Sequence, residues 1–427
     1  MKTRTAYLAT FVFLMLSSAV FAAGKTAETL AVEAVANDTA MSVPAIRELR
    51  AMGSVGLDAL FTRYAADIDR FIKTGNATAD WKRIAAALDT VAMQKDAYTS
   101  HLYWYTDLDA AKAAAKAKNK PILTLRLLGN LNEEFSCANS RLFRAILYSN
   151  AGVSKYLRDN YILHWKSVRP APRITIDFGD GRKIERTITG NSIHYIIDAN
   201  GNVIDAIPGL YNPATFLKYI TKSNEINKSV QKLPLAEQNR ALLKYRKDGF
   251  DAIVAERKKT IETAGVQMTE TKTGTLAILA APIAVAKMIV VDEYSILRVY
   301  DDFAKFEQSV NYDDWNKLAS VYSTNNALDA NSIAMIRRQN AKTGLSEAEF
   351  EGLFAKLNSF LALDTTRNDF LFHTKLYEWL NRDRPGDLES LNAQVYDKIF
   401  QTPNSDKWLG LYSTDVYTAL DGNGIIK

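Results

Sequence analysis

A single cysteine carries most of the chemistry that this sequence offers. Cys137 is the only cysteine among 427 residues, which excludes an internal disulfide and a cysteine-based zinc site. A lone thiolate can still attack a disulfide and form a mixed disulfide, but an external thiol must then release it. Ser140 follows three residues later and brings a hydroxyl close to the sulfur. Cys137 and Ser140 are therefore the candidate catalytic residues, and the candidate reaction is thiol–disulfide exchange.

The thiol is predicted to lie at the start of a helix. Ser136 is a suitable N-cap for a helix that begins at Cys137 and runs to about Leu147. Unpaired backbone N–H groups at a helix N-terminus favour the thiolate form of a cysteine. Ser140 is expected to donate a hydrogen bond to the sulfur, and Arg141 on the same helix is expected to add positive charge. A fully buried and inert thiol is the alternative, since free cysteines often behave as small apolar residues.

Other residues that could assist Cys137 have ordinary structural interpretations beside the functional ones. Arg126 interrupts the apolar stretch 122–128, where it either steers the Cys137 loop or an acidic ligand, or reaches solvent from a strand end. The solvent-reaching arginine is the commoner case and is the one we expect. His164 and His194 are possible proton carriers, but a histidine on a strand is more often structural.

Composition and motifs exclude several classes of function. The 53 Lys and Arg against 48 Asp and Glu give a net charge of only +5, too small in so long a chain to indicate nucleic-acid binding. The four histidines are scattered singly, so no metal site is expected. No serine-hydrolase, phosphate-binding or dinucleotide motif stands between a strand and a helix, and no cofactor is expected.

The first residues are typical of a signal peptide. Lys2 and Arg4 precede an apolar run over 6–16, and small residues up to Ala22 suit cleavage there. The run is shorter than the roughly 20 residues that span a bilayer, which disfavours the alternative of a membrane anchor. We therefore expect an exported protein, periplasmic or extracellular, without a transmembrane span in its mature part. Residues 23–43 lack a clear apolar face and are predicted to be a flexible tail.

Hydrophobic periodicity divides the rest of the chain into three regions. Residues 44–100 show the apolar spacing of helices, residues 101–222 alternate between helix and strand patterns, and residues 223–427 return to the helical period. The predicted fold class is a central α/β domain, a mixed sheet with flanking helices, between mainly α-helical N- and C-terminal regions. In the central region the expected elements are a helix at 108–117 with Asp107 as its N-cap, a near-continuous apolar strand at 122–128 covered on both faces, and a strand at 161–168. Hairpins are expected at 173–189 and 192–207, with turns at 179–181 and 200–201, followed by a helix at 213–220. The helices expected in the C-terminal region include two separate ones at 235–247 and 251–263.

This order of elements resembles the thioredoxin fold over roughly residues 101–222. The Ala-rich helix 108–117, followed by Lys120-Pro121 and an apolar strand, looks like the beginning of exported bacterial-type thioredoxin-like proteins. The segment 137–140, Cys-Ala-Asn-Ser, stands where that family has its redox motif, and 193–204 looks like its late hairpin. The resemblance implies a CxxS-type, thioredoxin-like domain with Cys137 as its attacking thiol.

Two positions depart from the family pattern. Ser140 replaces the second, resolving cysteine, and Ser192 stands where the family has a cis-proline in the loop that pairs with a substrate backbone. The first hypothesis is a monothiol exchange, isomerase-like or thiol-trapping factor. Its partners would be disulfide-bonded or thiol-containing client proteins and an external thiol reductant. The second hypothesis is a redox-inactive thioredoxin-like scaffold that binds a protein or another ligand.

Overall fold

The computed structural model describes residues 25–187, 190–266, 312–382 and 387–400, with residues 405, 407, 419, 420 and 425 besides. The predicted signal peptide, residues 1–22, lies outside the described residues. Within them, no helix combines the length and the apolar character needed to cross a bilayer. The described chain is a mixed α/β structure, as the alternating patterns predicted.

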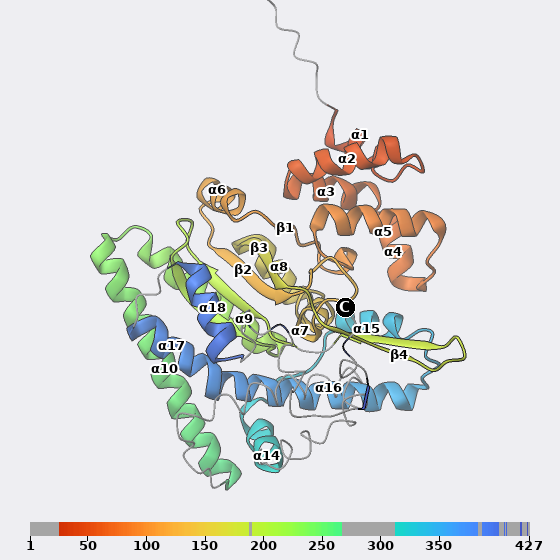
Figure 1. The fold of residues 1–427 in the computed structure, drawn as a ribbon. Coiled ribbons are helices and arrows are strands. Elements are labelled where there is room, and N and C mark those ends of the chain that lie inside the picture. The colour runs from red at the N-terminus through yellow and green to blue at the C-terminus, as the bar shows by residue number, and fades with distance from the viewer. Residues whose placement is uncertain are drawn as a thin grey trace, which may run out of the picture.

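Helices form the N-terminal region, and they begin earlier than the sequence suggested. They are α1 (Ala27–Glu33), α2 (Thr39–Ala51), α3 (Ser54–Arg63), α4 (Ala65–Thr74) and α5 (Ala79–Ala92), followed by the short turn η1 (Ala97–Thr99). The prediction of a flexible tail over 23–43 is wrong from Ala27 onward. Leu30 and Ala31 of α1 are fully buried in one apolar cluster with Leu49 and Leu57, so α1 is held by packing rather than by a periodic pattern of its own. Figure 1 shows these helices stacked at one end of the molecule.

A five-stranded mixed sheet forms the centre. Its strands are β1 (Trp104–Tyr105), β2 (Ile122–Leu128), β3 (Ile162–Arg169), β6 (Ile193–Ile197) and β7 (Val203–Pro208), in the order β1-β3-β2-β6-β7. β1, β3 and β2 are parallel, whereas β6 is antiparallel to β2 and β7 is antiparallel to β6. Every residue of β2 is buried, which confirms the prediction of a strand covered on both faces.

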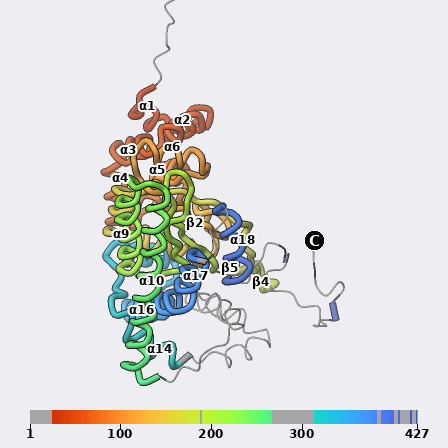
Figure 2. The backbone as a smooth tube through the Cα atoms, turned by 90° about the vertical axis from the view of Figure 1, so that its left-hand side faces the viewer, coloured from red at the N-terminus to blue at the C-terminus, as the bar shows by residue number. Residues whose placement is uncertain are grey.

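The helices around the sheet also follow the predicted order. They are α6 (Leu108–Lys118), α7 (Ala138–Leu142) with its π-helical continuation η2 (Phe143–Leu147), α8 (Ala151–Asn160) and α9 (Pro213–Val230). Asp107 caps α6 as predicted, since its carboxylate accepts a 2.7 Å hydrogen bond from the Ala110 N–H. The first predicted hairpin is the separate ribbon β4 (Arg173–Asp177) and β5 (Lys183–Thr187), which projects from the body of the protein (Figures 1 and 2).

The C-terminal region is helical, as predicted. Its described elements are α10 (Leu235–Ala264), α14 (Tyr312–Tyr322), α15 (Ala330–Gln339), α16 (Glu347–Arg367), the π-helical η3 (Asn368–His373), α17 (Thr374–Arg382) and α18 (Leu388–Lys398). Two separate helices had been expected at 235–247 and 251–263, but the structure has one. Gly249 is accommodated inside α10 because it faces Tyr377, whose ring would lie 2.9 Å from any Cβ at that position.

One hydrophobic core joins the sheet to these C-terminal helices. It contains Leu125 of β2 and Ile196 of β6 together with Phe360 of α16, Leu376 of α17 and Val395 of α18. Helix α16 runs beneath the sheet from one side of the molecule to the other (Figure 1). The change in secondary structure near residue 222 is therefore not a boundary between separate cores.

Candidate functional site

Cys137 lies where the loop after β2 turns into α7. It is the N-cap residue of α7, and its N–H donates a 3.1 Å hydrogen bond to the carbonyl of Leu128, the last residue of β2. The sequence therefore placed the thiol at a helix N-terminus correctly. The side chain has no solvent exposure and belongs to the main hydrophobic core. A thiol in this position cannot contact a reagent or a client protein unless the residues that cover it move.

Two serine hydroxyls contact the sulfur. Ser192, in the loop before β6, has its Oγ 3.2 Å from Sγ, and the Oγ of Ser140 is 3.6 Å away. The Ser140 hydroxyl donates its proton to the carbonyl of Cys137 at 2.9 Å. It is therefore placed to accept from the thiol rather than to donate to a thiolate. The structure thus brings together three of the predicted residues, with Ser140 in a different hydrogen-bonding role.

Ser136 does not cap the helix. Because α7 begins at Ala138, the cap position falls on Cys137, and no hydrogen bond joins the cap side chain to the backbone. The Ser136 hydroxyl is buried and has no hydrogen-bond partner among the described residues. Its carbonyl, however, accepts bonds from Arg141 Nε at 3.2 Å and from the Thr187 hydroxyl at 3.1 Å. The residue fixes the loop through its backbone.

Arg141 points away from the thiol, toward the β4–β5 ribbon. Besides its bond to Ser136, its Nη2 donates to the Thr187 hydroxyl at 2.7 Å. Arg144, one turn later, is buried and donates to the carbonyls of Glu133 and Glu134. Burial lowers the pKa of Arg144 from its ordinary value. Neither guanidinium forms a hydrogen bond to Sγ in the described structure.

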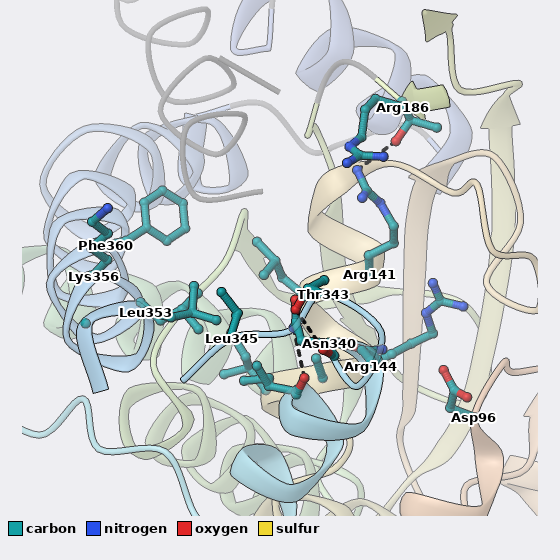
Figure 3. A pocket seen from close by; sticks show the side chains of 18 of the residues that line it. Asp96, Arg141, Arg144, Arg186, Asn340, Thr343, Leu345, Leu353, Lys356 and Phe360 are labelled. Carbon is teal, nitrogen blue, oxygen red and sulfur yellow. Dashed lines mark hydrogen bonds between the residues drawn. The ribbon is translucent and has the colours of Figure 1, made fainter. Parts of the chain in front are cut away.

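A large groove is lined in part by residues of α7 and η2. Its volume is about 1620 Å³, and Cys137 is not among its lining residues. In Figure 3, Arg141 and Arg186 point into one corner, while Leu353, Lys356 and Phe360 of α16 form the opposite wall. The groove therefore combines apolar surface with charged groups of both signs, since Asp96, Glu134, Glu185 and Glu349 also line it, and it lies between the α/β part of the chain and the C-terminal helices. Sequence reasoning missed it, because its two walls come from segments about 200 residues apart.

Helix α18 and the residues after it cover the loop that contacts the sulfur. The hydroxyl of Tyr396 donates to the carbonyl of Asn191 at 3.1 Å. The amide of Asn191 in turn donates to the carbonyl of Phe400 at 3.4 Å. Tyr396 and Phe400 are themselves buried. Burial is the main cause that raises the pKa of the Tyr396 phenol, and the charge of a nearby Cys137 thiolate raises it further. The thiol thus lies beneath a segment that is distant in the sequence.

Arg126 does not reach solvent, so that expectation is wrong. Its side chain is fully buried in β2, donates to Thr124, and forms an ion pair of 2.9 Å with Glu389 of α18. The physical reason is that α18 packs over this part of the sheet and supplies the carboxylate that a buried guanidinium requires. The alternative interpretation, an arginine that steers the Cys137 loop or an acidic ligand, stays a prediction, because Glu389 belongs to the same chain.

The two strand histidines have structural hydrogen bonds. His164 Nδ1 is 2.7 Å from the Thr124 hydroxyl, and His194 Nε2 is 2.7 Å from the Tyr148 hydroxyl. Burial is the main cause that lowers the pKa of both histidines to about 3. They are neutral at ordinary pH and are not poised to exchange protons with the thiol.

A second polar cluster lies at the junction of β7 with the C-terminal helices. His373 is fully buried, with Nε2 3.4 Å from Asp205 Oδ1 and Nδ1 3.4 Å from Asp369 Oδ1. Burial alone would lower the pKa of His373, but the two carboxylates outweigh it and raise the pKa to about 9. Tyr219 and Tyr322 donate to Asp369 at 2.7 and 2.6 Å. Sequence analysis missed this cluster, although Asp369 and His373 stand one helical turn apart.

The described residues hold no metal-binding cluster, and comparison with known proteins gave no match. Within the described residues, no group of three or more His, Cys, Asp or Glu side chains is arranged to hold a metal ion. No family model, curated protein or solved structure matches the chain.

Proposed function

We propose that this chain is an exported, thioredoxin-like protein that acts as a redox-inactive binding scaffold. The order of elements supports the thioredoxin-like part of the proposal. Helix α6, strand β2, the helix that Cys137 caps, strand β3, the β6–β7 hairpin and helix α9 follow one another in the order that the resemblance implies. The serine-for-cysteine change at Ser140 supports the redox-inactive part.

The observation that carries the proposal is the complete burial of the Cys137 thiol. Thiol–disulfide exchange requires the attacking sulfur to approach a disulfide in line, which a sulfur without solvent exposure cannot do. A hydrogen bond between Sγ and the Ser192 hydroxyl, 3.2 Å apart, gives the buried thiol a polar partner within the core. Cys137 then acts as a small packing residue, and function is left to the surfaces around the sheet.

The groove beside α7 supports binding as that function. A volume of about 1620 Å³ exceeds the roughly 300–1000 Å³ of ordinary small-molecule pockets, so a polypeptide segment suits it better. Arg141 and Arg186 would favour acidic groups, Glu134 and Glu185 would favour basic ones, and Phe360 on the opposite wall would favour apolar side chains. The expected ligand is a protein segment that carries charges of both signs and apolar side chains.

Monothiol exchange is the second candidate function. It is favoured by one specific observation, the position of Cys137 at the N-cap of α7 with Ser140 and Ser192 against the sulfur. In that case the Cys137 thiolate would attack a disulfide of a client protein and form a mixed disulfide with one of its sulfurs. The other sulfur of the client would leave as a thiolate. An external thiol would then free Cys137. The reaction requires the cover above the sulfur to open.

Two measurements separate these functions. Labelling of Cys137 by N-ethylmaleimide in the native chain should be at least a hundredfold slower than in urea if the scaffold proposal is right. Partner recovery from the export compartment should be equal for the wild type, Cys137→Ala and Cys137→Ser. Rapid native labelling, or mixed disulfides that disappear in both variants, would instead establish monothiol exchange. Cell fractionation of the full-length chain tests export.

A further inference from the structure

We propose that an extended segment of a partner protein binds in the large groove as a third strand, paired with the free edge of β5. The inference rests on the proposed scaffold function and names the conformation and the charge of its ligand. The bound segment lies between β5 on one side and α16 on the other. It carries an acidic side chain beside Arg186 and apolar side chains at alternate positions.

The register of the β4–β5 ribbon decides which backbone groups of β5 point outward. The Phe178 N–H donates a 3.1 Å hydrogen bond to the Arg182 carbonyl, so this is a hydrogen-bonded pair. Hydrogen-bonded and non-hydrogen-bonded pairs alternate along an antiparallel ladder. The pairs that β4 forms with Lys183, Glu185 and Thr187 are therefore non-hydrogen-bonded. These three residues of β5 direct their N–H and C=O groups away from β4.

The outward edge of β5 borders the groove. Glu185, Arg186 and Thr187 all line it, although successive side chains of a strand point to opposite faces. Lining from both faces indicates that the strand meets the groove edge-on. In the described part of the chain, no strand other than β4 pairs with β5. An unpaired strand edge beside a groove is a template for an added strand, and main-chain hydrogen bonds supply much of the affinity in that mode of recognition.

Helix α16 supplies an opposite wall with room for a polypeptide backbone. Leu353, Lys356 and Phe360 are spaced by three and four residues, so they share one face of α16, and all three line the groove (Figure 3). Gly352 lines it too, and a Cβ on this glycine would meet no atom within 4 Å. Glycine inside a helix is less favourable than alanine, and packing within the described structure does not require it here. Close approach of a ligand backbone to α16 would give this glycine a role.

The charges around β5 select an acidic residue in the bound segment. Two carboxylates of the groove already have cationic partners, since Glu134 is 3.4 Å from Lys95 and Glu185 is 3.2 Å from Arg173. Among the described residues Arg186 forms no ion pair, and its Nη1 donates a 3.1 Å hydrogen bond to the Glu185 carbonyl. An acidic side chain would give this guanidinium a carboxylate. The Glu185 carbonyl could then accept an N–H of the added strand.

The other charged groups of the groove do not change this preference. Glu349 accepts a 2.8 Å hydrogen bond from the Ser346 N–H at the start of α16. Asp96 is close enough to the buried Arg144 guanidinium to stabilise its charge. Lys356 on the opposite wall is, like Arg186, without an ion pair in the described structure. A basic residue of the ligand therefore meets carboxylates that are already engaged, and it contributes less than an acidic one.

A synthetic peptide tests the proposal on the full chain. The probe is a fluorescent peptide of ten residues in which valine and glutamate alternate, so that all its carboxylates share one face of a strand. We expect saturable binding by fluorescence anisotropy, and binding about tenfold weaker to Arg186→Ala. Arg182→Ala is the matched control, because Arg182 stands at the tip of the same ribbon, pairs with Asp180 and does not line the groove. This variant should bind the peptide as the wild type does.

Two further measurements test the strand pairing and its place. The same peptide with every backbone nitrogen methylated keeps its side chains but cannot donate hydrogen bonds, so it should bind about tenfold more weakly or not at all. Gly352→Ala adds one methyl group to the groove wall and favours the helix. Its Tm should equal or exceed that of the wild type, while its affinity for the peptide falls several-fold.

Several results would overturn the proposal. These are the absence of saturable binding, equal binding of the methylated peptide, and unchanged affinity in either Arg186→Ala or Gly352→Ala. A wild-type dimer that dissociates in Arg186→Ala would also overturn it, because the edge of β5 would then belong to a second copy of the chain. If Arg186→Ala loses its fold by circular dichroism, the methylated peptide and Gly352→Ala decide the outcome. The scaffold function is judged separately by the labelling rate of wild-type Cys137, so the two can fail independently.

Discussion

The hydroxyl of Tyr396 donates a 3.1 Å hydrogen bond to the main-chain carbonyl of Asn191, the residue before the serine that contacts the Cys137 sulfur. One side chain near the C-terminal end of α18 thereby fixes the loop that closes over the only thiol. This relationship bears on whether the thiol can react, because the same loop carries Ser192 against the sulfur.

Removing this hydroxyl should loosen the loop. Tyr396→Phe removes the hydroxyl that donates to the buried Asn191 carbonyl, and we expect the free energy of unfolding to fall by about 1–2 kcal/mol. Labelling of Cys137 below the unfolding transition should become several-fold faster. Tyr161→Phe is a matched control, because it removes a buried hydroxyl that donates to the Ile220 carbonyl elsewhere. The same gain in labelling in the control would show that global stability, not the loop, governs access.

The thiol itself should be replaceable by serine more easily than by alanine. Cys137→Ala removes the partner of the buried Ser192 hydroxyl and leaves a small cavity, so we expect a loss of about 1–3 kcal/mol in urea unfolding. Cys137→Ser keeps a group that can hydrogen-bond to Ser192 and should cost less. If Cys137→Ala were more stable than Cys137→Ser, the sulfur would act only as an apolar atom.

The His373 cluster should make stability depend on alkaline pH. Its folded pKa is about 9 against an ordinary 6.5, so its contribution is fully present below pH 6.5 and is lost as pH rises through 9. The difference corresponds to about 3 kcal/mol. Burial would raise the pKa of Asp205, but bonds from His373 and Tyr245 outweigh it and lower the pKa, so this contribution is lost as pH falls below 3.8. Other titratable groups that face the cluster are Tyr211, Tyr219, Tyr322, Tyr377, Arg246 and Asp369.

Urea titrations of the wild type and His373→Gln at pH 6, 7.5 and 9 measure this dependence. The difference in unfolding free energy between the two proteins should shrink steadily as pH rises. A constant difference would mean that His373 has the same pKa in the folded and unfolded chain, and a difference that grows with pH would mean that the histidine is neutral in the folded protein.

A pair of glycines should distinguish close packing from backbone strain. Gly209 and Gly179 both have left-handed φ angles, +73° and +75°. A Cβ on Gly209 would lie 2.7 Å from the Asn368 amide, whereas nothing lies within 4 Å of one on Gly179. We expect Gly179→Ala to cost about 1 kcal/mol and Gly209→Ala about 3 kcal/mol or more by thermal or urea unfolding. Equal costs would show that the junction between β7 and η3 can shift.

Much of the fold could be predicted from local patterns. The near-continuous apolar run of β2, the Asp107 cap of α6 and the turn-forming residues of both hairpins each act through neighbours in the sequence, and all were found where expected. The prediction failed at α1, where no periodic face is visible. Leu30 is buried there by helices that follow later in the chain, which local patterns do not encode.

The candidate site was predicted only in part. Its sequence determined that a lone thiol stands at a helix N-terminus after a buried strand, because caps and strand ends are local features. Tertiary structure alone decided that Ser192 meets the sulfur, that Glu389 meets Arg126 and that Tyr396 closes the loop above. These contacts join residues 55 to 263 positions apart, and only the packing of α18 on the sheet brings the more distant ones together. The sequence thus specified a group capable of chemistry, and burial by a remote helix decided whether that group can react.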